Sequence, residues 1–386
     1  MTQRPTIVQF NLSPTLGGAE VFTASFSRAL ATSGWPTRVI VAPDSRFWSE
    51  LDFGDVRLDA LGANAIPPQS ADIVVVHAPA PARLLAALSG RFVVGVAHQA
   101  IYDGTRPAYY DRADILLAVS RHVIATLNRY GLTRVLPVPL YAVAELSRGE
   151  SLKAPVRGPL FDPDARKPRD RLIALAERGR RAVAAERSYQ RRRGLTLGVV
   201  SRIAPLKQFP LMFERLAPIL ARHPDVNLEV FGAAVGYKAL AALRATLKPL
   251  HSRVRFWGRQ RDVAAAYRAV DYLLTGLPER EALGLNAIEA CFAGTPVLAI
   301  AAPPFTETMK DGVTGFLYID PREDAGVDFE RVLRGIQSGA LRPDLGAMAA
   351  QLLPFTFDRF AQRVDEVMAN VAAMQRGPAE AIGGAR

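Results

Sequence analysis

Short apolar runs alternate with amphipathic helical patterns along most of this chain, and this alternation restricts the possible folds more than any other feature. In the first part we expect strands at residues 6–12, 38–42, 72–77, 92–98, 115–120 and 135–140, with helices at 20–31, 82–88 and 122–129. Strands that are apolar almost throughout are typical of a parallel sheet with helices on both faces. Residues 1–145 are therefore predicted to form a Rossmann-like domain, whose ligands bind beyond the carboxyl ends of the strands.

The same alternation resumes in the second half, with strands expected at residues 196–201, 227–231, 253–257, 272–275, 296–300 and 315–319. The predicted fold class is α/β, with two Rossmann-like parallel-sheet domains. We expect an N-terminal domain at 1–145, a basic and helical linker or insert at 146–195, and a C-terminal domain at 196–354. Residues 355–386 are expected to form a terminal helix that crosses back to the first domain, followed by a disordered glycine-rich tail.

Residues 277–300 contain the most informative local pattern. A short helix is expected between Gly284-Leu285 and Ala293-Gly294, with Glu281 in the loop before it and Glu289 inside it. The first amides of this helix have no partner within the helix and carry partial positive charge, which suits a phosphate. Two carboxylates beside them suit sugar or ribose hydroxyl groups instead. The pattern indicates a sugar nucleotide, and the alternative is a pair of solvated acidic side chains.

Other polar residues also stand where predicted strands end. Gly17 and Gly18 follow the first strand and allow close approach of a ligand to the backbone, although the glycine spacing of a dinucleotide fingerprint is missing. His77 and His98 each end a strand, and either can be structural or functional. Arg202 and Lys207 flank the loop after the first strand of the second domain, where two cations could neutralise a diphosphate.

The net charge of +11 is concentrated in residues 146–195, which hold a net charge of +8. One apolar face of a helix in this segment could be formed by Leu172, Ile173, Leu175, Ala176 and Val183. Nucleic acid, an anionic membrane surface and plain solvent are all possible surroundings for it. Cys291, the single cysteine, is interpreted as a packed thiol. Because we find neither a signal peptide nor a membrane span, we expect a cytoplasmic protein, in solution or attached to the membrane surface.

Several of these motifs, taken in order, resemble the retaining glycosyltransferases of family 4, which have the GT-B fold with two domains facing a cleft. The matching segments are Gly17–Glu20, Val96–His98, residues 113–120, the Arg-x4-Lys pair, residues 253–258, the Glu-x7-Glu motif, residues 311–318 and the terminal helix. Residues 146–195 lie outside the resemblance. Ala282 also departs from it, because the family has glycine at this position.

The resemblance implies a role for each matching residue. Arg202 and Lys207 would hold the diphosphate, Glu281 the donor sugar, and His98 would lie near the reacting carbon. The remaining donor-binding residues would be Gly17, Gly18, Ser201, Trp257, Gly258, Leu285, Asn286 and Glu289. No metal and no cofactor would be needed beyond the nucleotide sugar itself.

The expected partners are a nucleotide sugar and a glycan or lipid-linked saccharide acceptor, as in the synthesis of bacterial envelope polysaccharide or lipopolysaccharide. An anionic membrane surface could dock on residues 166–193, and a solvated helix is the alternative. The alternative enzyme is a sugar-nucleotide epimerase, which shares the GT-B architecture but lacks the Glu-x7-Glu motif. Nucleic acid is not expected as a partner, because Tyr189 is the only aromatic residue in residues 167–194.

Overall fold

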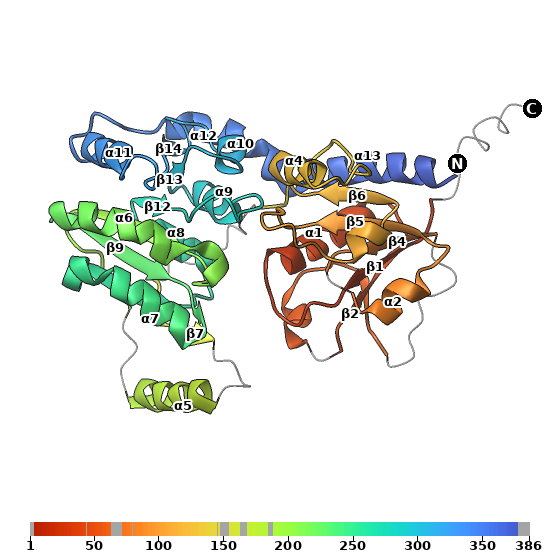
Figure 1. The fold of residues 1–386 in the computed structure, drawn as a ribbon, viewed down its shortest axis with the longest axis horizontal. Coiled ribbons are helices and arrows are strands. Elements are labelled where there is room, and N and C mark those ends of the chain that lie inside the picture. The colour runs from red at the N-terminus through yellow and green to blue at the C-terminus, as the bar shows by residue number, and fades with distance from the viewer. Residues whose placement is uncertain are drawn as a thin grey trace, which may run out of the picture. The chain divides into compact units, whose positions relative to one another are not determined.

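The computed structural model describes residues 4–43, 45–62, 72–78, 80–144, 146, 154–162, 168–183 and 188–376. It divides into two compact units, one made of Met1–Val143 with Leu353–Arg386 and the other of Ala144–Leu352 (Figure 1). Each unit is built on a six-stranded sheet whose strands are all parallel. The predicted fold class, two Rossmann-like α/β domains, is therefore confirmed.

Unit 1 orders its strands β3-β2-β1-β4-β5-β6. Their bounds are β1 Ile7–Asn11, β2 Thr37–Val41, β3 Arg57–Ala60, β4 Ile73–Val76, β5 Phe92–Ala97 and β6 Ile115–Ala118. Phe10 of β1 stands opposite Ile40 on one side and Val76 on the other. Because the chain moves outward from β1 in both directions, the sheet changes winding direction between β1 and β4.

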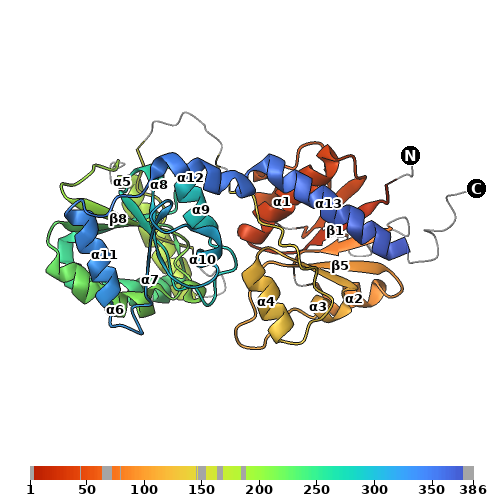
Figure 2. The same ribbon diagram turned by 90° about the horizontal axis from the view of Figure 1, so that it is seen from above.

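The helices of unit 1 cover both faces of this sheet, and α1 and α13 lie on one face (Figure 2). Their bounds are α1 Gly18–Thr32, η1 Arg46–Glu50, α2 Ala82–Ala87, α3 Tyr109–Arg112, α4 Arg121–Arg129, η4 Leu353–Phe355 and α13 Phe357–Arg376. Phe360 of α13 packs edge-on against Phe22 of α1, with ring centroids 5.4 Å apart. The C-terminal helix thus completes the core of the N-terminal unit.

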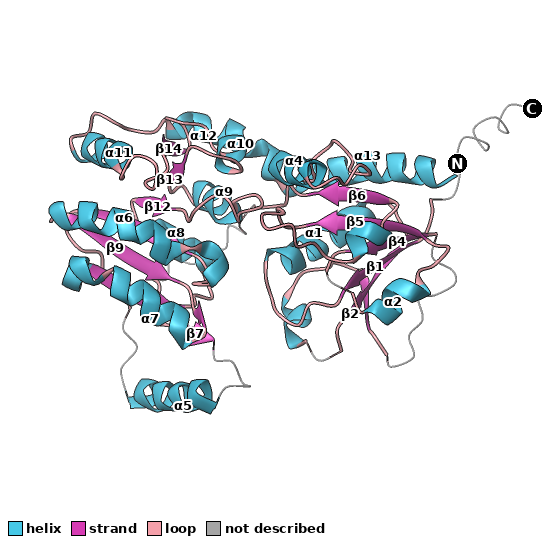
Figure 3. Ribbon diagram, in the orientation of Figure 1, coloured by secondary structure: helices cyan, strands magenta, loops and turns pink. Residues whose placement is uncertain are grey.

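Unit 2 repeats the arrangement, with strand order β11-β9-β8-β12-β13-β14. Figure 3 shows the strands of both units in magenta and the helices in cyan. The strands are β8 Leu195–Val200, β9 Val226–Phe231, β11 Val254–Gly258, β12 Tyr272–Leu274, β13 Val297–Ile300 and β14 Gly315–Tyr318. Leu197 of β8 stands between Leu228 and Tyr272. The winding direction changes here between β8 and β12. A separate two-stranded sheet pairs β7, Phe161–Asp162, with β10, Ala234–Val235.

The helices of unit 2 bury one large apolar cluster against its sheet. Their bounds are α5 Pro168–Val183, η2 Pro205–Lys207, α6 Phe209–Arg222, α7 Tyr237–Thr246, η3 Lys248–Arg253, α8 Val263–Arg268, α9 Leu285–Phe292, α10 Phe305–Thr308, α11 Val327–Gln337 and α12 Leu345–Leu352. Cys291 is buried in α9, and burial raises the pKa of its thiol to about 12. The interpretation as a packed thiol is confirmed.

One expected strand was wrong, and one observed strand was missed. Residues 135–140 form no strand, and only Val135 bridges to Leu116. Pro137 and Pro139 have no N–H group to donate to a sheet, which explains the difference. The sequence also gave no indication of β3, because this edge strand exposes most of its side chains and lacks an apolar run.

The basic segment is only partly one helix. Ile173 of α5 packs against the core of unit 2, whereas Leu172 and Leu175 are 69% and 67% exposed, so the three do not share one face. Residues 188–193 follow the sheet of unit 2, where Tyr189 donates a hydrogen bond to Ala269 O at 2.7 Å. Arg191 pairs with Asp271. The predicted disordered tail, 377–386, lies outside the described residues.

Within the described ranges, no helix combines the length and the apolar composition that a membrane span requires.

Candidate functional site

The predicted donor site of unit 2 lies where its sheet changes winding direction. The loop with Arg202 and Lys207 follows β8, and the loop with Glu281 follows β12, the neighbouring strand. Parallel sheets bind ligands at the carboxyl ends of the two strands that flank such a point. Both predicted loops therefore meet at one edge of the sheet.

Lys207 and Glu281 are in direct contact in this structure. Lys207 Nζ lies 2.5 Å from Glu281 Oε2, and both side chains are largely buried. The loops that carry them approach closely, since a Cβ atom on Gly276 would lie only 2.9 Å from Lys207 O. Glycine at 276 thus lets the end of β12 pass the η2 turn.

Arg202 is exposed at the start of the same loop. Its side chain makes no hydrogen bond or ion pair with any other residue in the described part of the chain. Ser201, just before it, uses its hydroxyl group to bond Arg202 O at 3.2 Å. A cation that is exposed next to a lysine already paired with a carboxylate remains available for an anionic ligand.

Helix α9 presents its first amides at the same edge. Gly284 precedes it with φ 76°, and the first backbone bond runs from Ala287 N–H to Gly284 O at 2.9 Å. The N–H groups of Leu285 and Asn286 come before that bond, as the first groups of any helix do. Asn286 Nδ2 also donates to Val200 O, at 3.4 Å, which ties α9 to the end of β8. These amides are suited to bind phosphate oxygens.

Glu289 lies one turn further along α9 and is held by Tyr267 of α8, whose hydroxyl donates to Glu289 Oε2 at 2.6 Å. Burial raises the pKa of Glu289 to about 7, although the bond from Tyr267 and the charge of Lys207 both act to lower it. Lys207 is therefore close enough to influence both glutamates of the Glu-x7-Glu motif.

Trp257 and Gly258 lie at the end of β11, two strands away from β8. The Trp257 indole is buried, donates to Glu229 Oε2 at 2.7 Å and stacks on Phe231. A Cβ atom on Gly258 would lie 2.3 Å from Pro159 O, so this glycine allows the preceding segment to pass. Their role at a nucleobase stays a prediction.

Ala282 departs from the family pattern without a backbone penalty. Among the described residues other than glycine, only Gln208, His251 and Ala325 have positive φ. Position 282 therefore does not require the conformational freedom of glycine.

In unit 1 the predicted residues lie at the carboxyl ends of β1 and β5. Gly17 precedes α1 in an extended conformation, and Gly18 is the first residue of that helix. His98 follows β5 and is half-buried, with its ring edge-on to Phe22 at 4.9 Å. His98 Nε2 lies 3.4 Å from His77 Nδ1, so the two strand-end histidines are neighbours. Burial lowers the pKa of His98 to about 3.

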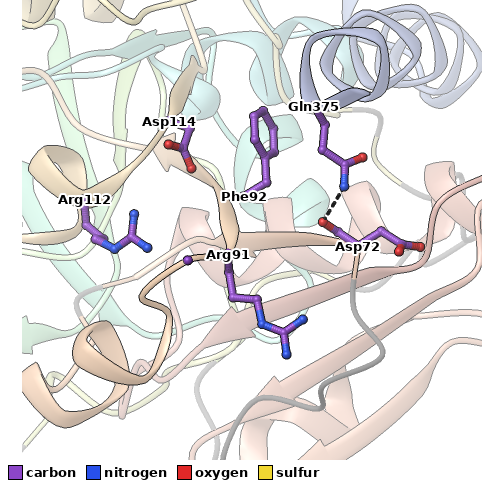
Figure 4. Close-up of a pocket in the computed structure, with 7 residues that line it drawn as sticks. Asp72, Arg91, Phe92, Arg112, Asp114 and Gln375 are labelled. Atoms are coloured by element: carbon purple, nitrogen blue, oxygen red, sulfur yellow. Dashed lines mark hydrogen bonds between the residues drawn. The ribbon is translucent and has the colours of Figure 1, made fainter. Parts of the chain in front are cut away.

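A polar hollow of about 620 Å³ lies elsewhere in unit 1 (Figure 4). Asp72, Phe92 and Asp114, which line it, stand at the amino ends of β4, β5 and β6. Gln375 of α13 closes one side by donating to Asp72 O at 2.9 Å. None of the predicted site residues lines this hollow, which lies at the edge of the sheet opposite to His98.

The structure therefore groups the predicted residues unevenly. It brings Lys207, Glu281 and Glu289 together with the α9 amides, and it brings His98 beside His77 in the other unit. Tyr267 and Gly276 contribute to this arrangement and were missed. Gly276 directly follows an expected strand and thus carried a weak signal, whereas nothing in the sequence marks Tyr267 as the partner of Glu289.

Comparison with known proteins finds similarity to glycosyltransferases over part of the chain. Residues 187–334 match the model of the family described as glycosyl transferases group 1. The chain is 32% identical over 223 residues to a D-inositol 3-phosphate glycosyltransferase of Salinispora tropica, covering 53% of this chain and 44% of that protein. It is 31% identical over 144 residues to a phosphatidyl-myo-inositol mannosyltransferase of Mycobacterium tuberculosis, covering 36% and 37%. The chain thus spans less than half the length of these relatives.

Among solved structures, the Anabaena protein HepE in complex with UDP and glucose superposes with a TM-score of 0.64. The alignment covers 95% of this chain and all of HepE, at 17% identity. This likeness supports the fold alone, and it extends over both units.

Proposed function

We propose that this chain transfers a hexose from a nucleotide diphosphate to an acceptor hydroxyl group, and the match of residues 187–334 to the model of the glycosyl transferases group 1 family supports this proposal. The observation that carries this proposal is the cluster at the edge of the unit 2 sheet. Lys207 is paired with the partly buried Glu281 and acts on the charge of Glu289, near the first amides of helix α9. Phosphates bind cations and amide donors, whereas sugar hydroxyls donate hydrogen bonds to carboxylates, and this cluster contains both kinds of group.

The proposed donor exchanges partners with the cluster when it binds. Its diphosphate takes the positive charge of Lys207 and Arg202 together with the Leu285 and Asn286 amides. Glu281, released from Lys207, then accepts hydrogen bonds from the sugar hydroxyls, and Glu289 accepts those of the ribose. Gly17, Gly18, Ser201, Trp257 and Gly258 complete the proposed donor contacts.

The same groups suit the chemistry of transfer. The bond between the sugar carbon and the diphosphate oxygen breaks, the acceptor oxygen bonds to that carbon, and the acceptor proton leaves with the diphosphate. Negative charge develops on the departing oxygen, where two cationic side chains and a helix terminus stabilise it. We therefore propose a metal-independent reaction that retains the configuration of the donor sugar, with His98 next to the reacting carbon.

For the acceptor, we propose a glycan or a lipid-linked saccharide at an anionic membrane surface, as in envelope polysaccharide synthesis. Relatives named for phosphatidylinositol and inositol phosphate support an acceptor of this general kind. Helix α5 supports the membrane contact, since it exposes Leu172 and Leu175 in a segment with a net charge of +8. Arg191 is paired with Asp271 and is left out of the proposed contact.

Liposome co-sedimentation tests the membrane contact. Replacing Leu172 and Leu175 by Gln should weaken binding to anionic vesicles at low salt, because apolar insertion and electrostatic attraction act together. The matched control is Leu345→Gln, an exposed leucine on α12. Equal binding by both variants, or none by the parent protein, would remove α5 from the proposal.

Thermal unfolding with a panel of nucleotide sugars tests the donor. A ligand that binds only the folded chain increases the free energy of unfolding, by about 2.7 kcal/mol at a hundredfold excess over Kd, and so raises the melting temperature. We expect at least one of the UDP-, GDP- and ADP-hexoses to shift the melting temperature of the parent, and the shift to vanish in Lys207→Ala. No shift with any of them would contradict the proposed function.

A further inference from the structure

We infer that His77 is a positioning residue for His98: a chain of hydrogen bonds from Gln9 through His77 orients the His98 ring and keeps its proton on Nε2. The inference rests on the proposed function, in which His98 contacts the donor sugar. The family resemblance gives a role to His98 only, so His77 and Gln9 are additions from the structure.

The chain of contacts crosses three neighbouring strands. Gln9 lies inside β1, His77 directly follows β4, and His98 directly follows β5, and these strands are adjacent in the sheet. Gln9 Oε1 lies 3.0 Å from His77 Nε2, and His77 Nδ1 lies 3.4 Å from His98 Nε2. Gln9 and His77 are fully buried, whereas His98 is half-buried. The contacts thus lead from the core to the edge of the sheet where ligands bind.

The proton positions follow from the acceptor at the buried end. Gln9 Nε2 donates to Thr37 Oγ1 at 2.9 Å, so its Oε1 faces His77 and requires a proton on His77 Nε2. A neutral imidazole has one donor and one acceptor, which leaves His77 Nδ1 as the acceptor. His98 must then donate from Nε2, and its Nδ1 keeps a lone pair.

Both rings are held in the neutral state. His77 packs against the rings of Phe22 and Phe26, and His98 packs edge-on against Phe22. Burial lowers the pKa of both histidines, that of His77 well below its usual range. A neutral His98 with a free Nδ1 accepts a hydrogen bond, so its partner is a hydroxyl group of the sugar or acceptor and not a phosphate oxygen.

Three substitutions at position 77 separate positioning from simple packing. His77→Phe keeps an aromatic ring beside Phe22 and Phe26 but removes both hydrogen bonds. His77→Asn places a side-chain oxygen near the position of Nδ1, where it can still accept from His98. His77→Gln extends towards Gln9 but places no hydrogen-bond acceptor beside His98. A positioning role predicts that Asn preserves function best, whereas a packing role predicts that Phe does.

The direct readout is the tautomer of His98, from nitrogen chemical shifts of the full chain with labelled histidine. The chain has five histidines, and loss of one signal set in His98→Gln assigns the ring. We expect the proton on Nε2 in the parent and in His77→Asn, and a mixture of tautomers in His77→Phe and His77→Gln. A proton on Nδ1 in the parent, or an unchanged tautomer in all three variants, would overturn the inference.

Kinetics give the second readout. With the best donor, we expect kcat to fall about tenfold in His77→Phe and less than threefold in His77→Asn, with KM nearly unchanged, because binding contacts remain. Equal kcat in the Phe and Asn variants would contradict positioning. If the parent turns over no nucleotide sugar, the proposed function fails, while the tautomer measurement still decides the role of His77. If His77→Phe does not fold, the Asn and Gln variants provide the same comparison.

Discussion

Lys207 occupies the position on which the proposed chemistry depends most. It bonds Glu281 at 2.5 Å and also lowers the pKa of Glu289 through its charge, so it acts on both carboxylates of the motif. Arg202 is exposed and carries no such contact. The two cations therefore differ: Lys207 must leave a carboxylate to bind phosphate, whereas Arg202 need not.

Both cations should nevertheless be essential for transfer. Replacing Arg202 or Lys207 by Ala should lower kcat/KM about a hundredfold, the usual effect of losing one contact to developing charge. The control is Lys238→Ala, an exposed lysine on α7. Turnover assays measure the rates, and circular dichroism shows whether the variants fold. Near-normal rates in both folded variants would show that the donor binds elsewhere.

Glu289 makes the stability of the chain depend on pH. Its pKa of about 7 lies above the ordinary value of 4.5, so between these values the folded chain binds more protons than the unfolded chain. The free energy of unfolding therefore falls as pH rises through this window. Glu289→Gln should be more stable than the parent at pH 8, by on the order of 1–3 kcal/mol, and equal to it near pH 4.5.

Urea unfolding at the two pH values measures this difference. Glu323→Gln, at an exposed position, is the control and should show no pH-dependent gain. A gain for Glu289→Gln that is the same at both pH values would contradict the assigned pKa. The same variant should bind nucleotide more weakly, because an amide offers one acceptor oxygen where the carboxylate offers two.

At the scale of elements, the approach of two loops shapes the cluster. The turn after β8 and the end of β12 come together at Gly276, where there is no room for a side chain. Gly276→Ala should push the η2 turn away and separate Lys207 from Glu281, because a Cβ atom 2.9 Å from a backbone oxygen must be accommodated by a shift. We expect activity to fall more than stability.

The control for this prediction is Gly179→Ala in α5, where a Cβ atom meets nothing within 4 Å. Alanine in a helix should leave stability equal or slightly higher. Steady-state kinetics and thermal unfolding of both variants provide the test. Full activity in Gly276→Ala would mean that the turn position is not important for transfer.

The elements that the sequence predicts well are those whose own residues form a recognisable pattern. Apolar runs such as Val74–Val76 and Val93–Val94 identify buried strands, and Gly294 marks the end of α9. The prediction of a strand at residues 135–140 was wrong because it gave the apolar residues more weight than the two prolines. β3 was missed because an edge strand needs no apolar face. The Tyr267–Glu289 bond depends on how α8 and α9 pack, and no local pattern records that.

At the scale of the molecule, the proposed reaction has one stereochemical outcome. A retaining transferase leaves the sugar in the product with the anomeric configuration of the donor. Proton magnetic resonance of the first-formed product measures this from the anomeric coupling. An inverted linkage, or activity that EDTA abolishes, would contradict the proposed mechanism.

The chain should also fail to fold its first unit without its last helix. α13 buries Phe360, Val364, Val367, Met368 and Val371, and Trp35 Nε1 donates to its Asp365 at 2.8 Å. Each such apolar side chain contributes about 1.5–3 kcal/mol, so their sum is comparable with the 5–15 kcal/mol of a typical domain. A chain that ends at Thr356 should lose the unfolding transition of unit 1, whereas one that ends at Arg376 should melt like the parent.

The return of α13 to unit 1 has a consequence for biosynthesis. The ribosome releases the amino-terminal strands first, yet the helix that covers α1 is translated only after the whole of unit 2. At about 5–20 residues per second, the nascent N-terminal sheet must wait tens of seconds with the face around Phe22 uncovered. During that interval it is a natural client for chaperones, and unit 2, whose sequence is continuous, can finish folding before the unit that precedes it.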